Sequence, residues 1–443
     1  MIGSVVSNIG VAVVVLGIII VLHELGHFLV AKFFKIKVET FSVGFGPRLI
    51  GFRKGDTDYR ISAFPLGGYV KMAGETPMDT ITGEDYEFLS KPKWQRFLVA
   101  AAGPAMNVVL AVALITGLYI YGTEIPEFLI GEVVVGAVDH GSPAEKAGLK
   151  AGDEIVSFEG KDKPTWEDVQ NQVLTSAGRP LAILVERNGQ RMDYTVTPER
   201  RGPEDAGYVG LMPVLKTVVR GFTTAASPAL KAGMKPGDEI IRVNGFDVRT
   251  SEHEVRQVIQ EATEKTIPIM VLRDGKEVEL EVAPELKDGR KMIGIEYALP
   301  TVHVKLGPID AFKKSLQTNK ENAALIFQVF GRLIRREASL KQLNGPVGIV
   351  AISGQAYEAG FATLLTFMAL ISLNLGVLNI MPIPILDGGV ILLLIIESLL
   401  GRDLSLRMKE RIVQTSFVFL LMLTVIVLYN DVVKLLPTSQ SAP

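Results

Sequence analysis

The sequence predicts a polytopic α-helical membrane protein with four transmembrane helices and two small α+β domains inserted between the second and third helices. Three observations predict this fold class. Four apolar segments are each about as long as a bilayer core requires. A fifteen-residue pattern occurs twice between the second and third of these segments. The chain as a whole is 48% hydrophobic with a mean hydropathy of +0.30, which exceeds what soluble domains of this size usually show.

The four apolar segments are expected to span the membrane at residues 1–31, 97–122, 361–400 and 412–435. The third segment is too long for one crossing and too short for two, and Pro382 and Pro384 interrupt it. We therefore expect unwound backbone between Pro382 and Gly389, followed by a short apolar piece near the cytoplasmic interface. Non-helical backbone at membrane depth persists only where protein or a water-filled cavity covers it, so a cavity is expected there.

Basic residues predict the orientation of these spans. The loop at residues 32–96 carries eleven Lys and Arg, and the short loop after the third span carries four more. Lys and Arg concentrate in cytoplasmic loops, so both chain ends and the inserted domains are expected outside. The formal net charge of −2, with no basic patch, excludes nucleic acid as a partner and leaves the lipid bilayer as the surroundings.

The inserted region contains a tandem repeat. The pattern SPAEKAGLKAGDEIV at residues 142–156 returns as SPALKAGMKPGDEII at residues 227–241, with eleven of fifteen positions identical. Each copy is followed by a strand, a helical stretch and a hairpin with an Asn-Gly or Asp-Gly turn. This order resembles PDZ domains, which bind extended peptides by strand addition, and we place two PDZ-like domains at residues 128–200 and 207–285. They either bind peptides and control access to another site or act only as spacers.

Two further segments have regular patterns. Residues 308–345 place apolar side chains at helical spacing beside basic ones, which is typical of an amphipathic helix that lies on the outer membrane surface or packs on the second PDZ-like domain. In the cytoplasmic loop, residues 38–45 and 59–64 alternate like strands, with a tight turn at the GFGP motif of residues 44–47. This membrane-associated hairpin either offers a sheet edge to a substrate or packs in the ordinary way.

The first span contains the sequence HELGH at residues 23–27. Residues four apart lie on one helix face, so His23 and His27 can direct ring nitrogens toward one cation, with Glu24 beside them. Ionisable side chains within a span are costly unless they face a cavity and have a function there. The pattern therefore predicts a zinc site of the protease type, in which Glu24 takes a proton from water.

A catalytic zinc site takes three protein ligands, so the two histidines need a partner. The chain has no cysteine, and its three other histidines fall in the predicted outside region. Apart from Glu24, the acids in the first three apolar segments are Asp387 and Glu397. We expect Asp387 to be the third ligand, because unwound backbone and the pair Gly388-Gly389 would allow close approach to a metal. Glu397 is expected to be a solvated or paired residue at a helix end.

These residues together predict hydrolysis of peptide bonds. A transmembrane helix hides its carbonyl groups in hydrogen bonds, so such a substrate must unwind locally before attack. Asn379 and Asn374 lie in the third span, and an amide can donate to and accept from an extended backbone. Either these amides contact the substrate, or they satisfy helix carbonyls that Pro382 leaves free.

Taken in chain order, these motifs resemble the site-2 protease family of intramembrane zinc metalloproteases. The resemblance rests on HELGH, on GFGP and PLGGYVKM in the cytoplasmic loop, on AGPAMN at residues 102–107, on the tandem PDZ-like domains and on NIMPIPILDGG at residues 379–389. It covers nearly the whole chain. It implies zinc held by His23, His27 and Asp387, with Glu24 as the base and Asn379 as a substrate contact.

The resemblance also implies partners and a location. Family members of this type lie in the bacterial inner membrane and cleave single-span proteins, typically anti-sigma factors already trimmed outside the membrane, and signal-peptide remnants. Their PDZ domains keep untrimmed substrates out. This chain departs from the family at Val390, where relatives often carry His or Arg after LDGG. The departure leaves the proposed ligands untouched and leaves substrate preference open.

Two other functions are compatible with the sequence. One is a non-proteolytic membrane receptor whose PDZ pair binds outside peptides and whose metal site is structural. The presence of Glu24 argues against it, because a structural zinc closes its fourth position and needs no base. The other is a membrane-anchored zinc protease that cuts soluble segments and has its third ligand elsewhere.

Overall fold

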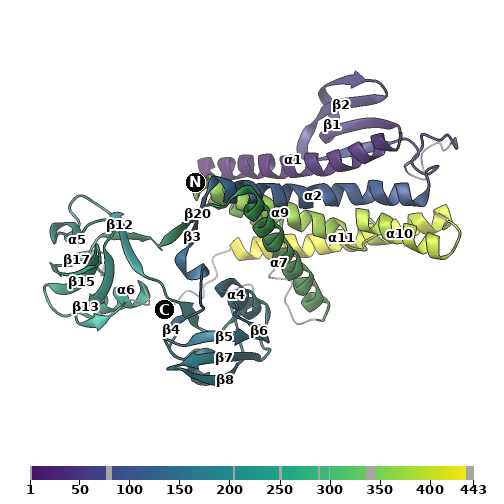
Figure 1. The fold of residues 1–443 in the computed structure, drawn as a ribbon. Coiled ribbons are helices and arrows are strands. Elements are labelled where there is room, and N and C mark those ends of the chain that lie inside the picture. Colours follow the sequence, from purple (N-terminus) through teal and green to yellow (C-terminus); the bar gives the residue numbers. More distant parts are fainter. Residues whose placement is uncertain are drawn as a thin grey trace. The chain divides into compact units, whose positions relative to one another are not determined.

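The computed structural model describes residues 2–75, 82–202, 205–248, 252–287, 290–298, 300–335 and 345–435. The chain forms two compact units, of which the first contains residues 1–123, 305–331 and 343–443 and the second contains residues 124–304 and 332–342. We call the first the membrane unit, because it holds the long apolar helices, and the second the repeat unit, because it holds the tandem repeat (Figure 1).

Four helices of the membrane unit are long and apolar enough to cross a bilayer, judged by length and composition over the described residues. Each falls on one of the four predicted spans, which confirms this part of the fold class. The helices are α1 (Ile2–Phe33), α2 (Lys93–Tyr121), α9 (Phe361–Asn379) and α11 (Leu406–Leu435).

Glycines allow α1 and α9 to approach α2 closely. A Cβ atom on Gly26 of α1 would lie 2.3 Å from the carbonyl oxygen of Ala102, and one on Gly376 of α9 would lie 3.0 Å from that of Pro104. Small residues at such positions are the usual means of close helix packing in membranes. The AGP sequence of α2 is thus the place where the three helices come together.

The predicted break in the third apolar segment is present but shorter than expected. It comprises residues 380–386, between α9 and α10 (Asp387–Leu399), and contains both prolines. The prediction that Gly388 and Gly389 are unwound is wrong, since both lie in the first turn of α10. A Cβ atom on Gly388 would lie 2.2 Å from the carbonyl oxygens of Ile380 and Met381. The glycines therefore let the new helix pack directly on the break.

The cytoplasmic loop forms two long, bent strands, β1 (Val38–Lys54) and β2 (Thr57–Met72). Thr40 pairs with both Asp58 and Lys71, so the first part of β1 lies between the two ends of β2. The prediction of a turn at residues 44–47 is wrong, because Gly44 and Gly46, both with φ near +90°, bend β1 without ending it. The chain reverses at Gly55 instead, with φ +62°.

The predicted amphipathic segment at residues 308–345 begins as the helix α7 (Pro308–Ile334). Ser315 is fully buried, and its hydroxyl donates to the carbonyl oxygen of Val112 at 2.8 Å, so one face of α7 packs on α2. Residues 336–344 of the segment lie outside the described residues. The next helix, α8 (Pro346–Glu358), contributes Ala356 to an apolar cluster with α1 and α9.

The repeat unit contains two α+β lobes with the same order of elements, as the tandem repeat predicts. In each lobe a strand leads to a short helix, a strand pair, a longer helix and a hairpin. The sheet orders are β6-β5-β7-β8 in the first lobe and β16-β15-β13-β12-β19 in the second. The first lobe contains β4 (Val135–Val138), α3 (Pro143–Ala147), β5 (Glu154–Phe158), β6 (Lys161–Asp162), α4 (Trp166–Thr175), β7 (Leu181–Arg187) and β8 (Gln190–Val196), and the second contains β12 (Thr217–Phe222), α5 (Pro228–Lys231), β13 (Glu239–Val243), β14 (Phe246–Asp247), α6 (Glu252–Glu261), β15 (Ile267–Arg273) and β16 (Lys276–Val282).

Both lobes extend beyond the boundaries predicted at residues 128–200 and 207–285. Antiparallel pairing of β11 with β4 draws residues 211–213 into the first lobe, and pairing of β19 with β12 draws residues 295–298 into the second. Strands of three or four residues have no periodic signal, which is why the sequence did not reveal them. The remaining short elements are β3 (Thr123–Pro126), a 3₁₀ turn (Glu127–Leu129), β9 (Glu199–Arg201), β10 (Ala206–Tyr208), β11 (Leu211–Pro213), β17 (Glu285–Lys287), β18 (Arg290–Met292), β19 (Ile295–Ala298) and β20 (Thr301–Val304).

An ion pair explains why Gly-Asp-Glu recurs in the repeat. The Asp153 carboxylate accepts hydrogen bonds from the backbone N–H of Lys150 at 2.9 Å and from the guanidinium of Arg187. Arg187 is the residue directly before the hairpin turn. In the second lobe, Asp238 makes the equivalent bonds to Lys235 and Arg273. Both carboxylates are buried, and each fixes a turn to a hairpin far along the chain.

The helix α4 begins with a reciprocal cap. The backbone N–H of Asp168 donates to the Thr165 hydroxyl at 3.2 Å, and the Asp168 carboxylate accepts the backbone N–H of Thr165 at 2.7 Å. Partial burial would raise the pKa of Asp168, but hydrogen bonds from Lys161 and Thr165 outweigh it and hold that pKa below its ordinary value. The charged form of Asp168 therefore stabilises the first lobe.

Candidate active site

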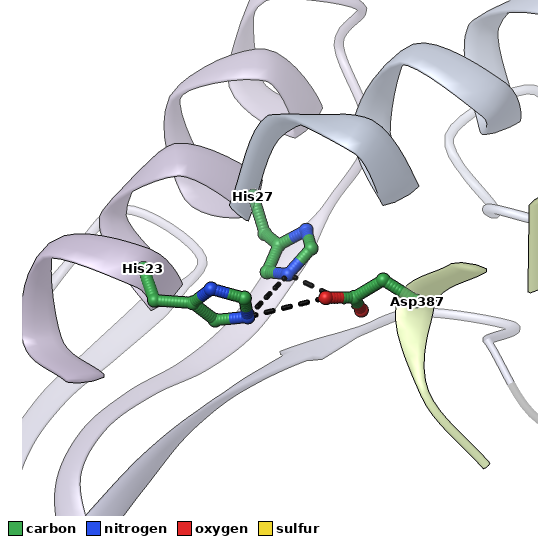
Figure 2. Close-up of side chains that lie close together, drawn as sticks. All are labelled: His23, His27 and Asp387. Atoms are coloured by element: carbon green, nitrogen blue, oxygen red, sulfur yellow. Dashed lines mark hydrogen bonds and ion pairs between the residues drawn. The ribbon is translucent and has the colours of Figure 1, made fainter. Parts of the chain in front are cut away.

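Three predicted site residues meet in the membrane unit. Helical spacing places His23 and His27 one turn apart on α1, with their Nε2 atoms 3.3 Å apart. The Asp387 carboxylate lies 3.2 Å from Nε2 of His23 and 3.5 Å from Nε2 of His27. Figure 2 shows the three side chains pointing toward one another, and their ligand atoms all lie within 4.8 Å. Two sequence segments some 360 residues apart thus form one donor set.

The first turn of α10 carries Asp387 to this place. The break at residues 380–386 turns the chain so that α10 starts beside α1, and the close packing at Gly388 fixes that start. Asp387 is the first residue of α10, where the helix dipole favours a carboxylate. The prediction that Asp387 lies beside the two histidines therefore agrees with the geometry. The first residue of a helix positions it, however, and not the unwound backbone that we expected.

The outer nitrogen of each imidazole faces a neighbouring group on α2. Nδ1 of His27 lies 2.7 Å from the carbonyl oxygen of Val99, so it carries the proton and leaves Nε2 free to accept. Nδ1 of His23 lies 3.3 Å from the side-chain amide of Asn107. Such partners orient metal-binding imidazoles and select their tautomer.

Asn107 is a functional residue that the sequence reasoning missed, except as part of the AGPAMN motif. It is 1% exposed, and its Oδ1 atom has no hydrogen-bond partner among the described residues. Rotating the amide by 180° turns this oxygen toward the ring N–H of His23, which satisfies both groups and frees Nε2. A fully buried amide in an apolar helix was the available signal.

Gly103 of α2 lies directly behind the two imidazoles, and its lack of a side chain leaves room for them. A Cβ atom on Gly103 would lie 2.2 Å from Nε2 of His27 and 2.8 Å from Cε1 of His23. These distances are far inside van der Waals contact, so only glycine leaves room for both rings. Gly103 is the second residue whose role the sequence alone did not reveal.

Glu24 lies beside the donor set and against β2. Its side chain is half-buried, and the backbone of Val70 lies near its carboxylate. A Cβ atom on Gly68 would lie 3.5 Å from Cγ of Glu24. Residues 68–72 pair with β1 on one side only, so the predicted sheet edge does lie next to the predicted base.

The two predicted asparagines differ. The Asn379 side chain ends α9 and lies 3.4 Å from Nε2 of His23, so it belongs to the site. Asn374 is half-buried one turn earlier and makes no side-chain hydrogen bond to the described residues. Glu397 is 1% exposed and forms an ion pair with Lys409 at 2.6 Å. Of the two predicted states, a paired or a solvated residue at a helix end, the structure shows the paired one.

A cavity opens onto these groups. Its volume is about 770 Å³, and its lining includes Glu24, the three donor residues and Arg96. Pro384, in the break, is also part of the lining. The cavity expected beside the unwound backbone is therefore present, and the donor set lines it.

Comparison with known proteins relates this geometry to one family. Residues 11–423 match the model of Peptidase family M50. A Neisseria meningitidis protein named "Putative zinc metalloprotease NMA0084" is 31% identical over 445 residues, which cover 95% of this chain and 97% of that protein. The "Regulator of sigma-E protease RseP" of Escherichia coli strain K12 is 30% identical over 448 residues, with 96% and 98% covered. The protein of the same name from Salmonella typhimurium strain 14028s is 30% identical over 460 residues, with 98% and 100% covered.

Proposed function

This chain belongs to Peptidase family M50 and is a metalloendopeptidase, and from that premise we propose that it hydrolyses peptide bonds within the membrane-spanning segments of single-span proteins. The observation that carries the proposal is the position of the site. Glu24 and the three donor residues lie among helices that are apolar enough to cross a bilayer, and they line one cavity. A peptide bond that reaches them is at membrane depth.

The donor set fits zinc. Two imidazole nitrogens and one carboxylate oxygen are the ligand types of catalytic zinc sites, and three protein ligands leave a fourth position for water or substrate. Relatives named as zinc metalloproteases support this metal. We assign His23, His27 and Asp387 as its ligands. When bound there, zinc supplies a Lewis acid that makes water more acidic and the scissile carbonyl more electrophilic.

Glu24 performs the proton transfers. Its carboxylate takes a proton from the water whose oxygen bonds to the carbonyl carbon, and it returns that proton to the amine nitrogen as the C–N bond breaks. The backbone of Val70 and Gly68 of β2 lie beside this carboxylate and limit its movement. Half-burial at the cavity wall keeps Glu24 accessible to the substrate while excluding most bulk water.

The substrate backbone is bound in an extended form. The free edge at residues 68–72 can accept an unwound segment by strand addition, which brings its carbonyl groups beside Glu24. Asn379, next to His23, is placed to donate to a substrate carbonyl or accept from an N–H. Asn374 remains a predicted second contact, although it makes no hydrogen bond to the site.

The relatives named regulator of sigma-E protease support a proposal for the partners and the location of this chain. We propose anti-sigma factors and signal-peptide remnants as substrates, and the inner membrane of a bacterium as the location, with both chain ends and the repeat unit outside. The two lobes act as PDZ domains that control access. The receptor alternative is set aside because the chain is an enzyme.

Reconstituted cleavage tests this proposal. Wild type and the Glu24→Gln variant are placed in liposomes with a single-span substrate that lacks its outer domain, and fragment ends are found by mass spectrometry. Wild type should cut inside the apolar span, and Glu24→Gln should not. The matched control is Glu358→Gln, which neutralises an exposed acid at the end of α8 and should cleave normally. Cuts only outside the span would support the alternative of a protease for soluble segments.

Deleting residues 130–285 tests the role of the lobes. If they control access, the deletion should allow cleavage of substrates that still carry their outer domain. The ratio of cleavage rates for trimmed and untrimmed substrates measures this control. An unchanged ratio would leave the lobes as spacers.

A further inference from the structure

Arg96 of α2 is a buried cation that has no ion-pair partner among the described residues. It is 5% exposed, its Nε atom makes no hydrogen bond, and its side chain forms no ion pair with any residue in the described part of the chain. It also lies in the first turn of α2, where the helix dipole disfavours a positive charge. Burying an uncompensated charge is costly, so an anionic ligand bound at this position would offset that cost.

Asp403, which the charge of Arg96 affects, and Glu397, which lines the same cavity as Arg96, are each paired with a lysine. Asp403 forms its ion pair with Lys93 at 2.9 Å, and Glu397 forms its ion pair with Lys409 at 2.6 Å. The hydrogen bond from Lys93 holds the pKa of Asp403 below its ordinary value, and Arg96 adds only a weaker effect through its charge. Two other acids of the cavity lining, Glu75 and Glu410, accept hydrogen bonds from Met72 and Gln414. In the described part of the chain none of these four acids forms an ion pair with Arg96, so its guanidinium can bind another anion.

Arg96 opens into the cavity that contains the donor set. It precedes Gly103, which lies against both imidazoles, by seven residues on α2. Seven helical residues rise about 10 Å, and an extended peptide covers that distance in about three residues. Arg96 therefore faces a substrate position a few residues from the bond that Glu24 helps to cleave, on the side toward the basic N-terminal end of α2.

We propose that Arg96 forms a specificity subsite for the carboxylate of an Asp or Glu residue of the substrate, about three residues from the cleaved bond on the cytoplasmic side. This inference rests on the proposed function. The planar guanidinium can donate two parallel hydrogen bonds to a carboxylate, and the buried setting strengthens them. An acidic residue arriving there compensates a charge that the enzyme leaves unpaired, so acidic substrates should be preferred about tenfold or more over their amides.

The test is a substrate series in liposomes. A single-span substrate carries Glu, Gln or Lys at each of the positions two to four residues to the cytoplasmic side of the mapped cut. Wild type should show a kcat/KM at least about tenfold higher for Glu than for Gln at one of these positions. Arg96→Gln should abolish this preference while cleaving the Gln substrate at a rate near that of wild type, and Arg96→Glu should prefer Lys. Arg402→Gln, which changes an exposed cation of the next loop, is the matched control and should keep the preference.

Peptide binding to an inactive variant distinguishes a subsite at Arg96 from a purely structural role of this residue. In a Glu24→Gln background, a fluorescent Glu peptide should bind more tightly than its Gln analogue, and adding Arg96→Gln should remove the difference. If Arg96→Gln does not fold, Arg96→Lys keeps the charge without the paired donors and should reduce the preference. The proposal is overturned if wild type cleaves the span but does not prefer Glu, or if Arg96→Gln slows the cleavage of every substrate equally. It is also overturned if the effect of Arg96→Gln depends on anionic lipid, because Arg96 would then bind a lipid phosphate. If wild type cleaves no span at all, the proposed function fails instead.

Discussion

Replacing Gly103 by Ala should remove zinc from the protein although alanine is the better helix former. By propensity alone, Gly→Ala inside α2 stabilises the helix by about 1 kcal/mol. The added Cβ atom, however, would lie 2.2 Å from Nε2 of His27, so that ring must move by about 1.2 Å to reach ordinary contact. Zinc–nitrogen distances of about 2.0–2.1 Å tolerate changes of only about 0.2 Å. We therefore expect zinc affinity to fall at least about 100-fold.

The assay is zinc content per chain of the purified protein, measured by mass spectrometry of the metal, together with the thermal unfolding midpoint. Gly117→Ala is the matched control, because it lies in the same helix and a Cβ atom there would meet nothing within 4 Å. Gly117→Ala should keep full zinc and activity. Full zinc and activity in Gly103→Ala would refute the reasoning, because the imidazoles would then not occupy the positions described.

Three further predictions concern the base, the orientation of His23 and the first lobe. Glu24→Gln should lower kcat by about 10²–10⁴ because an amide cannot take the proton that the Glu24 carboxylate accepts; single-turnover cleavage measures this. Asn107→Leu removes the amide that faces His23 and should lower zinc affinity about 10–100-fold in a chelator competition. Asp168→Asn should lose about 1 kcal/mol of lobe stability at pH 7, measured by Trp166 fluorescence in urea. The folded pKa of Asp168 is lowered, so wild type should lose this contribution as the pH falls below about 4, and the variant should not.

Matched control variants define the results that would contradict these three predictions. Asn107→Asp keeps an oxygen that accepts from the ring N–H of His23, so it should retain more zinc than Asn107→Leu; equal losses would show that Asn107 acts by packing. Trp94→Phe leaves Trp166 as the only tryptophan, so that the fluorescence reports the first lobe alone. An Asp168→Asn lobe with the pH dependence of wild type would contradict the capping argument. Glu24→Gln with the kcat of wild type would assign the base elsewhere.

The donor set could be predicted from the sequence because few residues at membrane depth can bind zinc. Only two histidines and a handful of acids lie in apolar segments, and Asp387 follows the one proline-rich break. The roles of Asn107 and Gly103 could not be predicted in this way. They depend on the distance between α1 and α2, which the packing at Gly26 determines and which local patterns do not reveal.

The position of the turn between β1 and β2 could not be predicted from the sequence. The GFGP motif has turn residues, yet positive φ at Gly44 and Gly46 only bends β1, and the reversal occurs at Gly55. Glycine permits both outcomes, so composition alone does not separate a bend from a turn. The two lobes were predictable because their repeat is long, whereas β11 and β19 join them through pairing between distant residues.

The central claim is that His23, His27 and Asp387 hold one catalytic zinc ion among the membrane-spanning helices. The most direct test is the number of zinc ions per chain in wild type, Glu24→Gln and Asp387→Asn, each assayed for cleavage of the same single-span substrate. One zinc ion should be present in wild type and in inactive Glu24→Gln, and zinc and activity should both be lost in Asp387→Asn. An Asp387→Asn protein that retains one zinc ion and cleaves the span would contradict the account.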